Sequence, residues 1–382
     1  MISRTAGERI ISIDLLRGAV MILMAIDHVR VYSGIPAGAT TPGIFFTRWI
    51  TNFCAPAFVF FAGTGAFLYG RKLGRKTALT KFLVSRGLLL VVLELTLIRF
   101  AWTFNLDYNS FILVGVIWML GWSMVLLALF IRLRPLTIAI IGILIIVFQQ
   151  LFHYLPEAFP LSIRKPVGTV WAFFYYDGFE PPPGIAVLYV LLPWLGVMMA
   201  GYGFGAIFLK QAEIRRKLCL WIGLSSIALF LIIGMFLLPA ESRDKPMPAL
   251  FRLLNQSKYP PSQLFLLMTL GPVIALVPYA EKARGWLAKI CLTFGRVPMF
   301  YYLLHIPLIH ACALVVNYLK GGAVHQEWYT SAPFTDVPEA GKWNLPMLYF
   351  IFILVEVILY HLCGRYANYK LKNQEKSWLR YL

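Results

Sequence analysis

The chain has 382 residues, of which 59% are hydrophobic and 14% are charged, and its formal net charge is +18. This composition excludes a soluble globular domain and indicates a polytopic membrane protein. In a soluble protein such a positive charge would point to nucleic acid as a partner. Here the placement of the basic residues gives a different explanation.

Ten apolar stretches, each long enough to cross a membrane, alternate with short polar connections. We therefore predict an all-α polytopic membrane protein with about ten transmembrane helices, and we treat residues 1–382 as one domain. The approximate ranges are 10–32, 50–69, 84–104, 111–131, 136–154, 185–208, 218–238, 263–279, 297–319 and 346–364.

Basic residues are concentrated in alternate connections. Of the 35 Lys and Arg residues, 22 lie on the same side as the N-terminus and 11 on the other side, and Arg17 and Arg296 lie within spans. The positive-inside rule then predicts that both termini are cytoplasmic in a multi-pass protein of the inner (cytoplasmic) membrane. The net charge follows from this bias and from attraction to anionic lipid, so we expect no nucleic-acid partner.

Two other patterns exclude further classes of site. The five cysteines form no CxxC pair, so we expect neither a disulfide framework nor a bound metal. The sequence "GYGFG" at 201–205 resembles a dinucleotide loop, but no strand precedes it. Small residues that let helices pack closely are the better interpretation.

The first span, "SIDLLRGAVMILMAIDHVR", carries four ionisable residues, which are costly at membrane depth unless they are paired or wetted. Arg17 and His28 are 11 residues apart, so they face the same side of a helix about 16 Å apart along its axis. Asp14 lies one turn before Arg17. A substrate could lie along this face with its charged end at Arg17 and its reacting end at His28. Alternatively, Asp14 and Arg17 pair with each other at the cytoplasmic membrane interface, and His28 forms hydrogen bonds in the outer headgroup layer.

Later spans offer partners for this face. Arg48 and Asn52 lie one turn apart at the outer end of the second span, where an interfacial Arg–Trp anchor is the alternative. In "GRVPMFYYLLHIPLIH", Tyr301 and Tyr302 precede His305 by about one turn, and a packing role is the alternative for this histidine.

These residue types suit acyl transfer to a hydroxyl or amine. That reaction needs a base near neutral pKa, which His28 beside Asp27 offers, and a cationic group for a charged donor, which Arg17 offers. Arg48, Asn52 or a tyrosine could polarise the substrate. An ion-coupled transporter also uses Asp, Glu and His at membrane depth, so the residues alone leave both functions open.

Four stretches, "RIISIDLLRGAVMILMAIDHVR", "RWITNFCAPAFVFFAGTGAFLYG", "NQSKYPPSQLFLLMTLGP" and "GRVPMFYYLLHIPLIH", together resemble bacterial relatives of heparan-alpha-glucosaminide N-acetyltransferase. The resemblance runs from about residue 9 to residue 362. It implies transfer of an acyl group, usually acetyl from cytosolic acetyl-CoA, to a glycan or other acceptor on the far side of the membrane.

The first span also resembles that of acyltransferase family three, in which an Arg and a His with this spacing are both needed; we carry those roles to Arg17 and His28. The chain departs from the lysosomal enzyme in one respect. That enzyme's proposed catalytic histidine lies in the loop after the first span, where "VYSGIPAGATTPGIFFTRW" contains none, and it has Asn at the position of His28. The base is therefore expected on the first helix.

The sequence thus predicts a membrane acyltransferase with acetyl-CoA as donor substrate and a carbohydrate or small molecule as acceptor. Its other expected partners are membrane lipids, and it could form a homo-oligomer. A transporter or a non-catalytic protein with the same fold is the alternative. The predicted site comprises catalytic His28, Asp27 and His305; donor-binding Asp14, Arg17, Arg71 and Lys72; and acceptor-pocket Arg48, Asn52, Tyr302 and Lys258.

Overall fold

A helix occupies each of the ten predicted span positions. The computed structural model describes residues 10–36, 41–175, 178–238 and 247–380. The helices at the predicted spans are α1 (Ile11–Tyr32), α3 (Cys54–Leu73), α4 (Lys76–Leu93) with the π-helical η2 (Glu94–Ile98) and α5 (Arg99–Thr103), α6 (Val116–Phe130), α7 (Pro135–Val147), α9 (Leu191–Phe204), α10 (Ala212–Phe236), α12 (Gln263–Ala280), α14 (Pro298–Gly321) and α15 (Leu345–Lys372).

Six helices in the described part of the chain are long and apolar enough to cross a membrane, and the number is seven if a bent pair of helices is counted as one span. The α1 and α4 segments fall outside this count because they carry several charged residues, and α6 because it has 15 residues. The protein is therefore a helical, multi-pass membrane protein, and ten spans remain a prediction.

The connections hold more structure than we expected. The basic connection before residue 297 forms α13 (Trp286–Gly295), and the long connection between the predicted spans 136–154 and 185–208 contains α8 (Leu161–Trp171). Two predicted spans start too early. Their first residues form strands β1 (Ile112–Val114) and β2 (Ile185–Val187), which pair in parallel, and the helices α6 and α9 begin after them. Shorter helices are α2 (Pro42–Trp49), η1 (Ile50–Phe53), η3 (Gln149–Tyr154), η4 (Pro156–Ala158), η5 (Gly205–Leu209), α11 (Ala249–Leu254), η6 (Gln326–Tyr329), η7 (Glu339–Gly341) and η8 (Ser377–Arg380).

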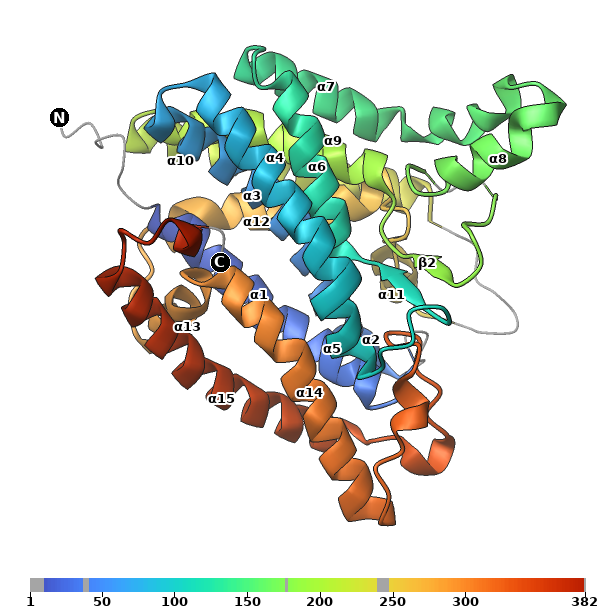
Figure 1. Cartoon of the computed structure of the whole chain (residues 1–382). Helices are drawn as coiled ribbons and strands as arrows, with labels where there is room; N and C mark the ends of the chain where they lie inside the picture. The colour runs from blue at the N-terminus through green and yellow to red at the C-terminus, as the bar shows by residue number, and fades with distance from the viewer. Residues whose placement is uncertain (1–9, 37–40, 176–177, 239–246, 381–382) are drawn as a thin grey trace.

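Helix α1 lies inside the bundle. It packs against α3, α12, α13, α14 and α15 (Figure 1). These neighbouring helices separate the charged residues of α1 from lipid. The ionisable residues of the first span therefore lie within protein, where paired or wetted charges are tolerated.

The "GYGFG" sequence lies at a close contact between helices. A Cβ at Gly201 would lie 2.0 Å from the carbonyl oxygen of Phe60 in α3, so a larger residue does not fit there. The hydroxyl of Thr64 donates to the carbonyl oxygen of Gly201 at 2.9 Å across the same contact. The predicted role in close helix packing is confirmed.

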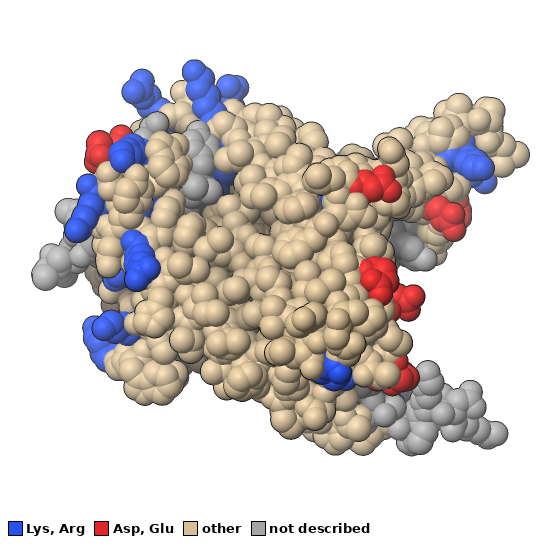
Figure 2. Space-filling view, turned by 60° about the horizontal axis from the view of Figure 1, so that its bottom comes forward, with Lys and Arg blue, Asp and Glu red and all other residues tan. Residues whose placement is uncertain are grey.

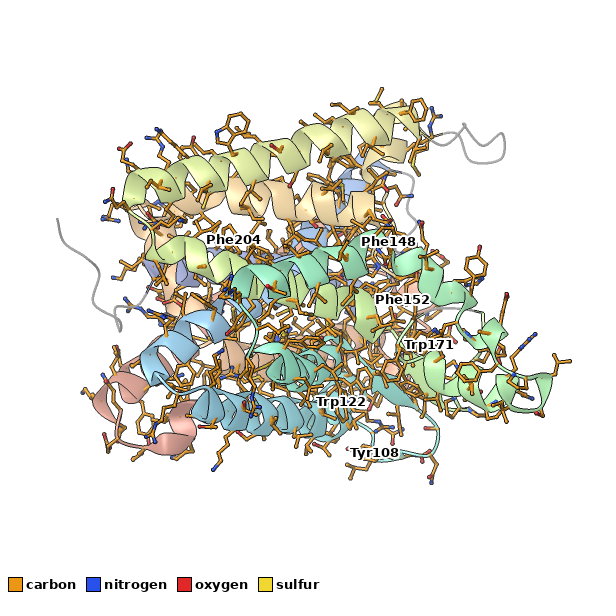
Figure 3. The ribbon with its side chains drawn as sticks, turned by 90° about the horizontal axis from the view of Figure 1, so that it is seen from above. Tyr108, Trp122, Phe148, Phe152, Trp171 and Phe204 are labelled. Atoms are coloured by element: carbon orange, nitrogen blue, oxygen red, sulfur yellow. The ribbon has the colours of Figure 1, made fainter. Side chains whose placement is uncertain are left out.

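A projection leaves the bundle after α7. The segments Pro135–Val147 and Gln149–Ala158 meet at an angle of 64°. The chain returns through α8, where the indole nitrogen of Trp171 donates to the carbonyl oxygen of Phe152 at 2.9 Å (Figure 3). This hydrogen bond ties the two limbs of the projection together.

Charge is divided between the two ends of the molecule. In Figure 2, Lys and Arg side chains gather mostly at one end and Asp and Glu mostly at the other. Ile11 at the start of α1 and Asn368 near the end of α15 line the same pocket. The first and last helices therefore have their terminal ends on the same side, which we call the basic end.

Candidate functional site

A cavity of about 1230 Å³ follows the charged face of α1, and we call it the central cavity. Lys72, Arg86 and Lys370 line it at the basic end. At the opposite end it is lined by residues of the connecting loops, which are Gly34, Ile35, Pro36, Leu188, Tyr189, Lys258, Tyr259, Pro333, Phe334, Thr335, Asp336, Val337 and Lys342. Asp14, Arg17 and His28 line it in between, so the polar face predicted for the first span borders a single space, and Asp27 lines the same space.

Arg17 reaches from α1 to α3. Its guanidinium donates to the carbonyl oxygen of Phe61 at 2.5 Å. Gly65 leaves room for it, because a Cβ at that position would lie 2.9 Å from the Arg17 Nη2 atom. Arg17 is therefore held as a fixed cation beside the cavity, nearer its basic end, and Asp14 lines the cavity one turn earlier.

His28 and His305 form a close pair that joins α1 to α14. Nδ1 of His28 lies 2.7 Å from Nε2 of His305, and the two rings stack with centroids 4.8 Å apart. His305 is fully buried, whereas His28 lines the cavity. Trp102 of α5 packs edge-on against the His28 ring at 4.9 Å, so the ring is held on two sides.

The carbonyl oxygens around His305 assign the tautomers of both rings when they are neutral. Nδ1 of His305 lies 2.7 Å from the carbonyl oxygen of Tyr302 and 3.2 Å from that of Tyr301. Because a carbonyl oxygen only accepts, Nδ1 of His305 carries the hydrogen and its Nε2 accepts. Nδ1 of His28 must then donate, which leaves the lone pair of His28 on Nε2. An imidazole with a free lone pair at a cavity wall is the arrangement that a general base requires.

Asp27 interacts mainly with its neighbour one turn later. Its Oδ1 atom lies 2.9 Å from Arg30 Nη2 and accepts from Arg30 Nε at 3.0 Å. Arg30 also donates to the carbonyl oxygen of Ile35 at 2.8 Å. The ion pair therefore fixes the chain where α1 leaves the bundle. His28 donates its Nδ1–H to His305 and not to Asp27.

Lys258 lies at the loop end of the cavity among aromatic rings. Its ammonium is 5.2 Å from the centre of the Tyr259 ring and 5.9 Å from that of Tyr189. Burial works to lower the pKa of Lys258, but Tyr189, Tyr259 and Asp27 raise it well above its ordinary value. Lys258 therefore keeps its positive charge, near Asp27.

The structure brings together most of the residues predicted for the site. The following predicted residues line the central cavity: Asp14, Arg17, Asp27, His28, Lys72, Lys258 and Tyr302. His305 lies directly behind His28. Arg48, Asn52 and Arg71 are not among the residues that line it, although Thr51, next to Asn52, is.

Several lining residues were missed at the sequence level. Arg86 and Lys370 lie in basic segments, where we attributed their charge to topology alone. Trp102 has no local signal that distinguishes it from other aromatic residues at span ends. Glu94 lines the cavity too, and its carboxylate accepts from the backbone N–H of Ile117 at 3.0 Å. That bond caps the start of α6, so Glu94 has the partner on another span that its depth requires.

Metal ligands do not cluster in the described residues. In that part of the chain no three His, Cys, Asp or Glu side chains come together in a way that would hold a metal ion.

A family model described as heparan-alpha-glucosaminide N-acetyltransferase, catalytic, matches residues 9–239, which is more than half of the chain. The chain belongs to this family. The predicted resemblance is thus confirmed at the level of the family, whose description supports a membrane acyltransferase. The matched range contains Arg17, His28 and Lys72, whereas Lys258 and His305 follow it. Comparison with curated proteins found no match to this chain.

Proposed function

We propose that this protein transfers an acyl group, acetyl in the simplest case, from cytosolic acyl-CoA to an acceptor at the opposite face of the membrane. The observation that carries the proposal is the central cavity, which has cations at one end, loops at the other and the free lone pair of His28 between them. A thioester donor and an acceptor could enter such a cavity from opposite ends and meet at His28.

The donor would enter at the basic end. Lys72, Arg86 and Lys370 line that end and carry the positive charge that attracts the phosphates of CoA. Arg17 lies further along, where it would neutralise or position a polar part of the pantetheine arm. Because α1 rises about 1.5 Å per residue, Arg17 and His28 are about 16 Å apart, which suits an extended arm laid along the helix.

The transfer step would use His28 as general base. Its Nε2 takes the proton from the acceptor hydroxyl or amine while the acceptor atom attacks the thioester carbonyl carbon. The carbon–sulfur bond then breaks, the thiolate leaves, and the proton on His28 passes to the sulfur. His305 positions His28 by accepting its Nδ1–H, which favours the imidazolium that forms during the step.

The acceptor would bind at the loop end. Tyr189, Tyr259 and Phe334 give this end aromatic surfaces, and Lys258 and Asp336 give it charged groups of both signs. A sugar or another small polar group presents apolar faces and hydroxyls to such a surface. Lys258 is the cation that could bind an anionic group on the acceptor or the developing oxyanion.

The remaining parts of the proposal follow the charge distribution. The basic end would face the cytoplasm, so both termini would be cytoplasmic, and the protein would lie in the inner membrane of a bacterial cell. Its partners would be acyl-CoA, the acceptor and lipid, with homo-oligomers allowed. No metal is required by this mechanism.

Proteoliposomes test the proposal. Labelled acetyl-CoA is supplied on the side that the basic end faces and candidate amines or sugars on the other. Label on the acceptor, with no transfer when donor and acceptor positions are exchanged, supports vectorial acyl transfer. Movement of intact acetyl-CoA or acetate across the membrane without acylated product would instead support a transporter, for which the ionisable residues at depth are the argument.

Donor binding can be measured separately. Purified protein at a CoA concentration of 100 times the dissociation constant should gain about 2.7 kcal/mol of stability, which raises its unfolding temperature. An unchanged unfolding temperature over a wide range of acetyl-CoA concentrations would count against a donor site in the central cavity.

A further inference from the structure

A second pocket, of about 630 Å³, lies between α13 and α15, which run beside each other (Figure 1). We call it the basic pocket. Its lining shares no residue with the lining of the central cavity, so it is a separate site. Its size falls within the range of small-molecule sites in proteins.

The charge of the basic pocket has one sign. Arg284, Lys289, Arg296 and Arg365 line it, and its lining residues include neither Asp nor Glu. All four side chains are exposed, so their charged groups can meet a ligand that approaches from outside. Such a pocket selects an anion, and phosphate is an anion to which arginine and lysine donate well.

The wall of the basic pocket is apolar in part. Ile11, Ala288, Leu292 and Ala367 contribute hydrocarbon surface beside the cations. On α13 the side chains of Trp286 and Leu287 are 71% and 60% exposed, which is the pattern of a helix that faces lipid at a membrane interface. A ligand that fits both surfaces carries a negative head and apolar chains.

We propose that the basic pocket binds an anionic phospholipid, with its phosphate among the four cations and its acyl chains against α13. The pocket lies at the basic end, where Lys and Arg gather on the face that Figure 2 shows. Basic pockets between membrane helices on the cytoplasmic side are known to hold such headgroups. The inference does not depend on acyl transfer, because neither His28 nor the central cavity takes part.

Lipid titration in nanodiscs tests the proposal. Protein in zwitterionic nanodiscs is titrated with phosphatidylglycerol, and bound lipid is counted by native mass spectrometry. The double variant Lys289→Gln with Arg365→Gln removes two cations of the pocket. The matched control, Arg216→Gln with Lys217→Gln, removes two exposed cations near the start of α10, outside the basic pocket. If each cation in contact with the headgroup contributes about fivefold, the pocket variant, which loses two of them, should bind the retained lipid about 10- to 30-fold more weakly.

Each result decides the question. A loss of retained lipid in the pocket variant with less than a twofold effect in the control supports a lipid site. Equal losses in both would show a general effect of surface charge and overturn the proposal. Displacement of the lipid by inorganic phosphate alone would identify a soluble anion as the ligand. Protection of Lys289 by a second copy of the chain in cross-linking, without lipid, would identify a dimer contact, and either result overturns the lipid site.

Discussion

His28 in α1 and His305 in α14 are joined by a 2.7 Å contact between Nδ1 of the first ring and Nε2 of the second. The carbonyl oxygen of Tyr302 holds the far side of His305, so one backbone acceptor determines where the lone pair of His28 lies. A carboxylate performs this task in the serine protease triad. Here a buried neutral histidine would perform it, which avoids placing a second charge inside the bundle.

His28→Ala should lower turnover about a hundredfold or more, because the group that accepts the acceptor's proton is lost. Stabilisation by acetyl-CoA should stay close to that of the unchanged protein, since the cations at the basic end remain. The measurement is labelled acetyl transfer in proteoliposomes. His153→Ala is the control, because His153 is exposed on η3 away from the cavity lining. Near-normal turnover of His28→Ala would remove His28 from the mechanism.

His305→Phe should lower kcat about 10- to 100-fold at an unchanged KM for the donor, because His28 loses the acceptor for its Nδ1–H. His305→Gln should recover part of the activity, since the glutamine carbonyl can accept that hydrogen bond. A purely structural role for His305 would predict losses that follow thermal stability in both variants. Such a correlation, with no recovery by Gln, would contradict the positioning role.

Lys72 and Arg71 make a matched pair for the donor site, because they are adjacent at the end of α3 but only Lys72 lines the central cavity. Lys72→Gln should raise the KM for acetyl-CoA about tenfold and leave kcat nearly unchanged, since a cation that attracts the CoA phosphates binds ground state and transition state alike. Arg71→Gln should stay within twofold. Equal effects of the two substitutions would mean that the surface charge as a whole attracts the donor.

The sequence predicted the positions of the helices well, because long apolar runs leave few alternatives in a membrane. It also predicted that Arg17 and His28 face the same side, since helical periodicity fixes that relation. The contact between His28 and His305 spans 277 positions of the chain, and nothing local marks it. Arg71 and Lys72 could not be distinguished in the sequence. They differ because the side of α3 that carries Lys72 borders the central cavity and the side that carries Arg71 does not.

Other differences arise where charge interrupts or shortens an apolar run. The charged residues around 286–295 predicted a connection, yet Trp286, Leu287 and Leu292 give that stretch enough apolar surface to form α13. In α7 the apolar run continues past Val147, but the helix bends at Phe148. Apolar content alone does not predict the position at which a helix bends and the chain leaves the bundle.

Topology is tested by cysteine labelling of two exposed positions. Lys76 is the first residue of α4, directly after the connection from α3, and Glu180 lies in the long loop before β2. If the basic end is cytoplasmic, an impermeant thiol reagent should label Glu180→Cys but not Lys76→Cys in intact cells, and both after the membrane is opened. Labelling of Lys76→Cys alone in intact cells would reverse the orientation and place the donor entrance outside.

Gly201→Ala should destabilise the fold by about 1–3 kcal/mol, which is the usual effect of forcing a methyl group into a packed interior. The added carbon would meet the carbonyl oxygen of Phe60, and two backbones cannot move apart as easily as a flexible side chain.

The control is Gly364→Ala in α15, where the nearest contact would be an ordinary 3.9 Å. That variant should be neutral or slightly stabilised, because alanine favours a helix over glycine. Thermal unfolding in detergent measures both. Since α3 carries Lys72 and the carbonyl group that binds Arg17, a wild-type unfolding temperature for Gly201→Ala would show that the α3–α9 contact can widen without disturbing the wall of the central cavity.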